Sequence, residues 1–159
     1  MPSIIACIGM GSNLGDRRGT LEGAIAALAR TNGIHVQKVS SFHETEPVGG
    51  PPGQAMYLNA AAMIETDLDP HELLMALQTI EAQFGRVRSV HWGERTLDLD
   101  LLLFGKQKVS TPELTVPHPR MRVRRFVLEP LAEIAPELVD PITMRTIAEM
   151  LAEVEEGPS

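Results

Sequence analysis

The segment RTLDLDLLLF, residues 95–104, constrains the fold more than any other part of this sequence. In an extended strand, Asp98 and Asp100 point to one side and Leu97, Leu99 and Leu101 point to the other. The run continues through three further apolar residues to Phe104, so the strand enters a hydrophobic core. The pattern predicts a sheet with one packed face and one face that carries carboxylates.

The two aspartates indicate a cation site. Residues two apart on a strand have Cα atoms roughly 6.6 Å apart, near enough for two carboxylates to converge on one ion. Uncompensated burial of both anions would be costly, and a bound dication removes that cost. No Cys or His stands at ligand spacing, which favours Mg²⁺ over zinc. A solvated polar face is the alternative interpretation of this pair.

Half of the basic residues gather around the same segment. They are Arg86, Arg88, Arg95, Arg120, Arg122, Arg124 and Arg125. The whole chain carries a formal charge of −7, which disfavours a general nucleic-acid binder. A local cationic cluster in an acidic protein predicts a small polyanionic ligand, and arginine grips phosphate oxygens in bidentate fashion. Gly85 and Gly93 flank the arginine-rich loop, which suggests a segment that closes over the ligand.

The remaining pattern predicts alternating strands and helices. A buried strand over 4–8 precedes a helix that ends near Asn32 and Gly33, and a strand with a bulge follows over 34–42. A Pro/Gly-rich loop over 46–54 leads to a strand over 57–64, and Asp69, Pro70 and Glu72 predict the start of a second helix. A short apolar run over 126–128 leads into a C-terminal helix that carries Ile147 and Met150. This order predicts an α+β sandwich with helices on one face of an antiparallel sheet.

Composition predicts one ordinary globular domain over residues 1–159. Apolar residues make up 43% and charged residues 22%, and no apolar run approaches the roughly 18 residues of a membrane span. The N-terminus lacks a basic leader, so we expect no signal peptide. The single cysteine, Cys7, lies in an apolar run and suits a reducing compartment. We expect a soluble cytoplasmic protein.

Three weaker signals have competing interpretations. GMGSNLGD departs from both common phosphate-loop patterns, so we interpret it as a structural turn. His118 lies between two prolines, either as a surface residue or as a nucleotide contact. Tyr57, Trp92 and Phe126 are either core residues or a set that sandwiches a flat heterocycle.

Several strings in order carry a family resemblance: GSNLGD, SSFHETEPVG, YLNAA, GRVRSVHWGERTLDLDLLLFG and VPHPRM. The match covers nearly the whole chain, which resembles the 6-hydroxymethyl-7,8-dihydropterin pyrophosphokinases of folate biosynthesis. The resemblance implies a ferredoxin-like α+β fold with an additional C-terminal helix, and a monomer. It also implies ATP and two Mg²⁺ ions as cofactors, and pyrophosphoryl transfer to a pterin with release of AMP.

The resemblance also implies residue roles. Asp98 and Asp100 would hold the metals, with Arg86 and Arg95 as catalytic arginines. The residues implied on the nucleotide side are Gln78, Glu81, Arg88, Leu101, Thr115, His118 and Arg124. The residues implied around the pterin are Thr45, Pro47, Val48, Tyr57, Asn59, Trp92 and Phe126. His91 and Glu94 depart from the family pattern; His91 predicts a weaker or pH-dependent phosphate contact, and Glu94 predicts a looser catalytic loop.

Three rival functions remain open on sequence alone. An RNA-recognition module shares the same order of elements, but it predicts a basic surface and no acids among its stacking positions. A metal-dependent glycosyltransferase uses paired aspartates, but it normally needs a nucleotide-binding α/β domain for which 159 residues leave no room. An inactive homologue that only binds ligands is the third.

Overall fold

The protein is built on one antiparallel sheet. The computed structural model describes residues 3–13, 16–45, 56–84 and 97–156. The strands β2 (Ile34–Val39), β4 (Tyr57–Thr66), β1 (Ile4–Ser12) and β5 (Asp98–Phe104) lie side by side in that order. The three-residue strand β3 (His43–Thr45) pairs with the other end of β4. A separate hairpin is formed by β6 (Val109–Ser110) and β7 (Thr115–Val116).

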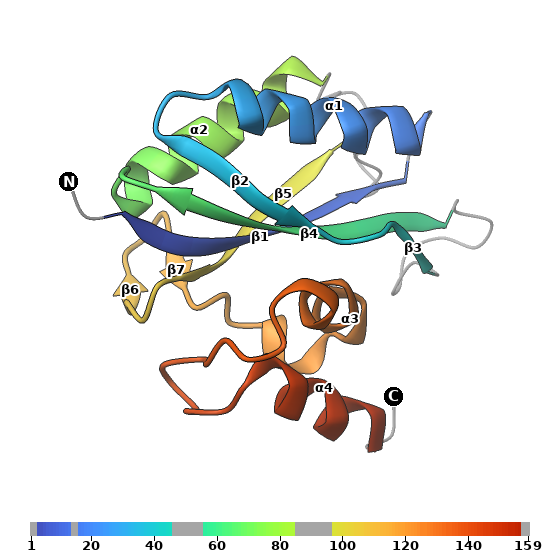
Figure 1. The fold of residues 1–159 in the computed structure, drawn as a ribbon, viewed down its shortest axis with the longest axis vertical. Helices are drawn as coiled ribbons and strands as arrows, with labels where there is room; N and C mark the ends of the chain where they lie inside the picture. The colour runs from blue at the N-terminus through green and yellow to red at the C-terminus, as the bar shows by residue number, and fades with distance from the viewer. Residues whose placement is uncertain (1–2, 14–15, 46–55, 85–96, 157–159) are drawn as a thin grey trace.

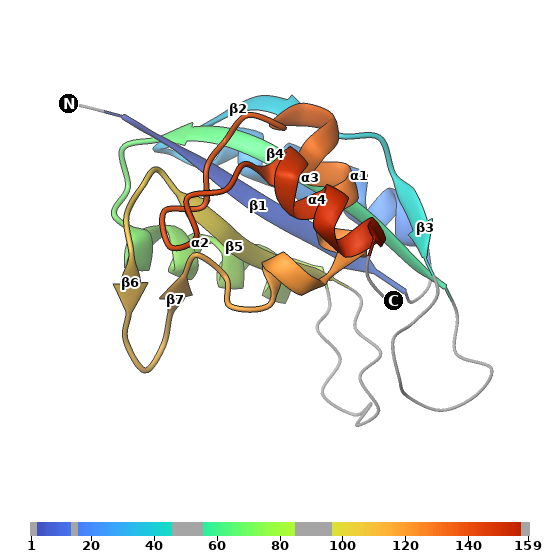
Figure 2. The same cartoon turned by 90° about the horizontal axis from the view of Figure 1, so that it is seen from below.

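Helices cover both faces of the sheet (Figure 1). The helices α1 (Arg17–Arg30) and α2 (Pro70–Gln83) lie on one face. On the opposite face lie the short 3-10 helix η1 (Met121–Val123), α3 (Arg125–Ile134) and α4 (Ile147–Glu156), with α3 next to the sheet and α4 packed on α3. Figure 2 shows the C-terminal helices lying across β1 and β4, while β5 extends past them.

The alternation of each strand divides the core into two clusters. On β1, Ala6, Ile8 and Met10 pack toward α1 and α2, whereas Cys7 packs toward α3 and α4. A register shift at Cys7 and Ile8 against β5 lets both Leu102 and Leu103 join the α3 and α4 side. Each face of the sheet is therefore apolar over part of its area, and polar residues occupy the part of the second face that the helices leave open.

Sequence signals explain where α1 and α2 begin. The side chain of Asp69 accepts a hydrogen bond from the backbone of Glu72, and Glu72 returns one to Asp69, which completes the capping box predicted at α2. At α1, Asp16 accepts a bond from the N–H of Gly19. The side chain of each Asp therefore satisfies one N–H in the first turn of its helix, that of Gly19 in α1 and that of Glu72 in α2.

The predicted α+β fold with its strand and helix order is confirmed, and three local predictions need correction. First, β1 continues past Ile8 to Ser12 because glycines at 9 and 11 remain within the strand. Second, the predicted bulge in β2 is present near Val36, but β2 ends at Val39 and β3 forms separately. Third, the apolar run over 126–128 belongs to a full helix, α3, that includes Pro130. The sequence predicted helices on one face of the sheet only. In the structure, α3 and α4 also cover the opposite face.

No helix in the described ranges is both long and apolar enough to cross a membrane.

Candidate active site

The acidic pair lies on the second face of the sheet, as the alternation predicted. Asp98 and Asp100 stand on β5 opposite Gly11 and Gly9 of β1. Asp98 is half-buried and Asp100 is exposed, whereas Leu99 between them is buried under α2. The carboxylates therefore face outward from a strand whose other side is fixed in the core. This gives two acids on a rigid support with access to a ligand.

Neighbouring side chains lie close to the two glycines opposite the acids. A Cβ atom on Gly11 would lie 3.0 Å from Oδ1 of Asn59, the residue that pairs with Gly11 on β4. A Cβ atom on Gly9 would meet the side chain of Leu102 at 3.3 Å. The absence of a Cβ at positions 9 and 11 therefore lets the side chains of Leu102 and Asn59 lie close to the backbone of β1.

Asn59 is held in one orientation by its neighbour on β3. Its Nδ2 donates a 2.6 Å hydrogen bond to Oγ1 of Thr45, and only 8% of Asn59 is exposed. Thr45 pairs with Tyr57, so these three residues form one polar cluster at the end of β4. A buried amide with one donor fixed in this way presents its other groups in a set direction, which suits recognition of a flat polar ring.

His118 lies next to the outer edge of β5. Its backbone N–H donates to the carbonyl of Leu102 at 3.0 Å, and its Nδ1 accepts from the N–H of Arg120 at 3.2 Å. Burial lowers the pKa of His118 below its ordinary value; the Asp100 carboxylate opposes this by raising it, and the charges of Arg124 and Arg120 lower it further. A neutral ring with an occupied Nδ1 carries its proton on Nε2, which makes it a hydrogen-bond donor.

Helix α2 contacts the other side of the acidic strand. Glu81 is 8% exposed, and its Oε2 accepts a 2.8 Å hydrogen bond from the backbone N–H of Leu99. Gln78, one turn earlier, is exposed. The side chain of Leu101 is buried against α1 and α2, so any ligand contact at this position would involve its backbone. Thr115 is exposed on β7.

The remaining predicted residues divide into two groups. The guanidinium of Arg124 lies over the ring of Phe126 at 5.6 Å, where α3 begins. Six predicted site residues lie outside the described residues: Pro47, Val48, Arg86, Arg88, Trp92 and Arg95. The departures His91 and Glu94 also lie outside them.

The donor set on β5 fits Mg²⁺. Within the described ranges, no group of three or more His, Cys, Asp or Glu side chains is placed to hold a metal ion. Two neighbouring carboxylates suffice for Mg²⁺, because this ion keeps several waters and takes its other ligands from substrate phosphates. Zinc would require a more complete set of nitrogen or sulfur ligands.

The sequence matches one family model over residues 7–136, described as 7,8-dihydro-6-hydroxymethylpterin-pyrophosphokinase (HPPK). This chain belongs to that family. A relative from Bacillus subtilis, named 2-amino-4-hydroxy-6-hydroxymethyldihydropteridine pyrophosphokinase, is 52% identical over 84% of this chain and 80% of its own length. A relative of the same name from Synechocystis is 45% identical over 94% of this chain and 76% of its own. The HPPK family is a transferase family, and the predicted resemblance is confirmed.

Solved structures confirm the fold of this HPPK family member. A structure of HPPK-DHPS in complex with substrates superposes with a TM-score of 0.77 at 13% identity. HPPK-DHPS of Plasmodium falciparum with pteroate gives a TM-score of 0.76, also at 13% identity. Both cover 96% of this chain, which spans only 43% and 42% of those longer chains. At this identity the likeness establishes the ferredoxin-like α+β fold alone.

The sequence analysis missed two residues that support the site of this HPPK family member, Glu133 and Arg17. Glu133 contacts Ser41 and His43, and Arg17 contacts Glu44 and the carbonyl of Met56. These contacts join segments up to 92 residues apart. No local pattern signals them, because alternation and capping describe neighbours in sequence only.

Proposed function

We propose that this chain transfers pyrophosphate from ATP to 6-hydroxymethyl-7,8-dihydropterin in folate biosynthesis, giving the pterin pyrophosphate and AMP. Family membership carries this function, because the curated relatives align over most of both chains under one enzyme name. The acidic pair on β5 supports it at the level of chemistry, since the position suits a metal-bound polyphosphate.

The proposed chemistry is a displacement at phosphorus. The hydroxymethyl oxygen of the pterin forms a bond to the β-phosphorus of ATP, the bond from that phosphorus to the oxygen bridging it to the α-phosphorus breaks, and AMP leaves. The proton of the hydroxyl passes to solvent. Two Mg²⁺ ions bound by Asp98 and Asp100 would supply charge neutralisation at the phosphates.

The proposed pterin site is the polar cluster at the end of β4. Asn59 would hydrogen-bond to the pterin edge, with its amide held by Thr45, while Tyr57 and Phe126 would face the ring. Trp92 and the backbone groups of Pro47 and Val48 complete the proposed set. Gly11 supports the proposed position of Asn59, because a Cβ atom there would lie 3.0 Å from the Oδ1 of Asn59.

The proposed nucleotide site lies along the outer edge of β5. The neutral ring of His118 would donate from Nε2 to ATP, and Arg124 would add positive charge beside it. Gln78, Glu81, Arg88, Leu101 and Thr115 are proposed to line the same side. Arg86 and Arg95 are proposed to stabilise the charge that shifts during transfer.

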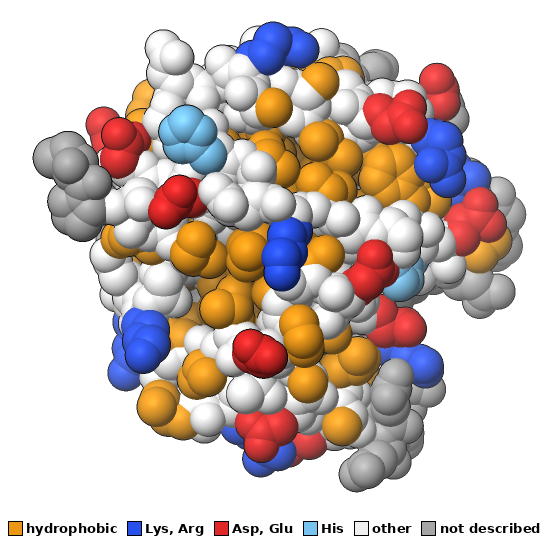
Figure 3. Space-filling model, viewed as in Figure 1, with side chains coloured by type: hydrophobic (Ala, Val, Ile, Leu, Met, Phe, Trp, Pro, Cys, Tyr) orange, Lys and Arg blue, Asp and Glu red, His pale blue; other side chains and the backbone are white. Residues whose placement is uncertain are grey.

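We further propose a cytoplasmic monomer that acts on small molecules and not on nucleic acid. On the face drawn in Figure 3, Lys and Arg side chains of described residues are interspersed with Asp and Glu and form no continuous basic patch. The formal charge of −7 agrees with this distribution. A nucleic-acid binder would require a basic surface to neutralise phosphates.

Mass analysis of the pterin product tests the proposed function. The purified protein is incubated with ATP, magnesium and 6-hydroxymethyl-7,8-dihydropterin, and a parallel reaction contains excess EDTA. We expect a pterin product with two added phosphates in the reaction without EDTA, and no such product in the reaction with EDTA. A singly phosphorylated pterin, or no phosphorylated pterin at all, would contradict the proposal.

A further inference from the structure

Strand β3 is a short edge strand that needs support from outside the sheet. It has three residues, His43, Glu44 and Thr45, and it pairs only with β4 among the described strands. Its last residue is Thr45, which accepts the hydrogen bond from Asn59. The position of β3 therefore decides where the Asn59 amide points.

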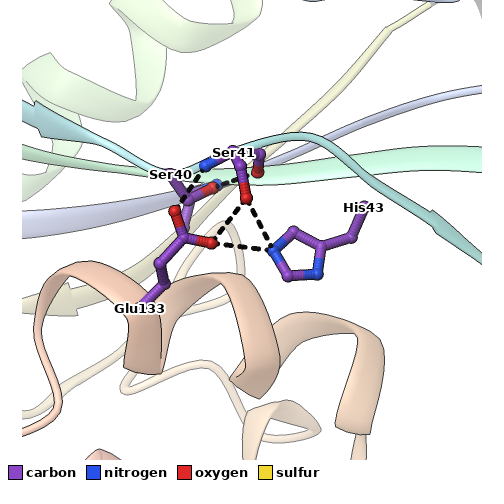
Figure 4. A network of polar contacts seen from close by, with 5 residues as sticks. Ser40, Ser41, His43 and Glu133 are labelled. Atoms are coloured by element: carbon purple, nitrogen blue, oxygen red, sulfur yellow. Dashed lines mark hydrogen bonds and ion pairs between the residues drawn. The ribbon is translucent and has the colours of Figure 1, made fainter.

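One support comes from α3 (Figure 4). The carboxylate of Glu133 accepts hydrogen bonds from the backbone N–H and the hydroxyl of Ser41, each at 2.7 Å. Its Oε1 also lies 2.9 Å from Nε2 of His43. The neighbouring Ser40 is fixed to β4, because its hydroxyl accepts from the N–H of Ala61 at 2.9 Å. Glu133 thus ties the entry to β3 onto a helix on one face of the sheet.

The other support comes from α1, on the opposite face. Arg17 donates from Nη2 to the carboxylate of Glu44 at 2.9 Å and from Nη1 to the carbonyl of Met56 at 2.7 Å. Met56 immediately precedes Tyr57, the residue paired with Thr45. One guanidinium therefore holds both β3 and the start of β4.

The two supports follow from the alternation of the strand. Successive residues of a strand point to opposite faces, so His43 reaches toward α3 and Glu44 reaches toward α1. The third residue, Thr45, returns to the face that carries Asn59. Because the carboxylates and cations involved are partly exposed, such ion pairs contribute little to global stability. We expect these ion pairs to act on the position of β3 instead.

We infer that Glu133 and Arg17 are positioning residues for substrate binding: together they hold β3 so that Thr45 fixes the Asn59 amide toward the pterin. This inference rests on the proposed function. Loss of either support lets β3 shift and leaves Asn59 without a fixed partner. The affinity for the pterin should fall, whereas ATP, which is proposed to bind along β5, should be unaffected.

Matched variants test the inference. Glu133→Ala is compared with Glu129→Ala, which removes a carboxylate and an ion pair with Arg125 from the same helix. Arg17→Met is compared with Arg30→Met at the other end of α1. Calorimetry measures the Kd of the pterin in the presence of magnesium and an α,β-methylene analogue of ATP, which resists the proposed reaction, and the Kd of the analogue alone.

We expect the pterin Kd to rise about fivefold or more in Glu133→Ala and Arg17→Met, the equivalent of about one hydrogen bond. The Kd of the analogue should stay within about twofold of the wild type, and both control variants should bind like the wild type. An unchanged pterin Kd in either support variant overturns the inference, as does an equal loss for both ligands or the same loss in the controls. If the wild-type protein does not bind the pterin, the proposed function fails and the inference fails with it.

Discussion

The carboxylate of Glu81 on α2 accepts a 2.8 Å hydrogen bond from the backbone N–H of Leu99, the residue between Asp98 and Asp100 on β5. The N–H of Leu99 points away from β1 at the outer edge of the sheet, where no strand among the described residues pairs with it. The side chain of Glu81 therefore accepts the hydrogen bond that a neighbouring strand would otherwise accept from Leu99. It fixes the backbone that carries both proposed metal ligands.

Replacement of Glu81 tests whether it acts on the strand or on the nucleotide. Glu81→Ala leaves a buried N–H without an acceptor, which costs about 1–3 kcal/mol. Glu81→Gln keeps an acceptor oxygen, so it should retain most of the stability and most of the ATP affinity. Urea denaturation and calorimetric titration with Mg-ATP measure the two effects, with Gln83→Ala on the same helix as control. Equal loss of ATP affinity in both Glu81 variants would instead indicate direct contact with the nucleotide.

Asp100→Asn should abolish most turnover while the fold remains intact. The exposed side chain of Asp100 makes little contribution to packing, and its loss relieves repulsion with Asp98. We expect turnover to fall by about 10²-fold or more, as for loss of one group that stabilises transition-state charge. Steady-state rates and thermal unfolding are measured together. Wild-type rates in this variant would exclude Asp100 as a metal ligand.

Gly11→Ala should weaken pterin binding more than ATP binding. The added Cβ would lie 3.0 Å from Oδ1 of Asn59, and the 2.6 Å bond to Thr45 restricts how far that amide can retreat. We expect the KM for the pterin to rise about fivefold or more, equivalent to about one hydrogen bond, with little change in the KM for ATP. Unchanged KM values for both substrates would show that Asn59 has room to move without loss of function.

The ion pair between Arg122 and Asp140 predicts a pH-dependent stability. Asp140 is fully buried, and its Oδ2 lies 2.6 Å from Nε of Arg122. Burial raises the pKa of Asp140, but hydrogen bonds from Arg122, the N–H of Ile142 and Thr143 lower it more, so the net shift is below the ordinary 3.8. Because the folded pKa is depressed, this stabilisation is present above pH 3.8 and is lost as the pH falls through the lower folded value.

Arg122→Met should therefore destabilise the protein by about 3 kcal/mol at pH 7, because it leaves a buried carboxylate without its cation. The part of the acid-induced loss of stability that comes from Asp140 should also become smaller than in the wild type, because the substitution raises the folded pKa of Asp140 towards its unfolded value. Arg145→Met removes a mostly exposed pair with Glu153 and should cost about 1 kcal/mol or less. Urea denaturation over a pH series measures both variants. Equal effects of the two substitutions would contradict a structural role for Asp140.

Side-chain alternation and helix capping could be predicted from the sequence, because both depend on residues that are neighbours in the chain. The alternation around Asp98 and Asp100 predicted their shared face, and the capping residues Asp69 and Glu72 predicted the start of α2. The helix α3 was missed because Pro130 lies inside it and its apolar residues were interpreted as a short run. Here the packing of Leu128 and Leu131 in the second core cluster outweighs the local cost of proline.

Contacts between distant segments could not be predicted from one sequence. Glu133 and Ser41 are 92 residues apart, and Glu81 and Leu99 are 18 apart on different elements. Each contact depends on how helices are placed over the sheet, which propensity and periodicity do not specify. The positions of Asn59, Thr45 and Gly11 as one cluster likewise follow from strand register.

Nucleotide product analysis tests the proposed pyrophosphoryl transfer most directly. The protein is incubated with Mg-ATP and 6-hydroxymethyl-7,8-dihydropterin, and AMP is separated from ADP by chromatography. Pyrophosphoryl transfer predicts one AMP for each pterin consumed, with no AMP when either magnesium or the pterin is omitted. Formation of ADP in place of AMP, or AMP that does not depend on the pterin, would contradict the proposed function.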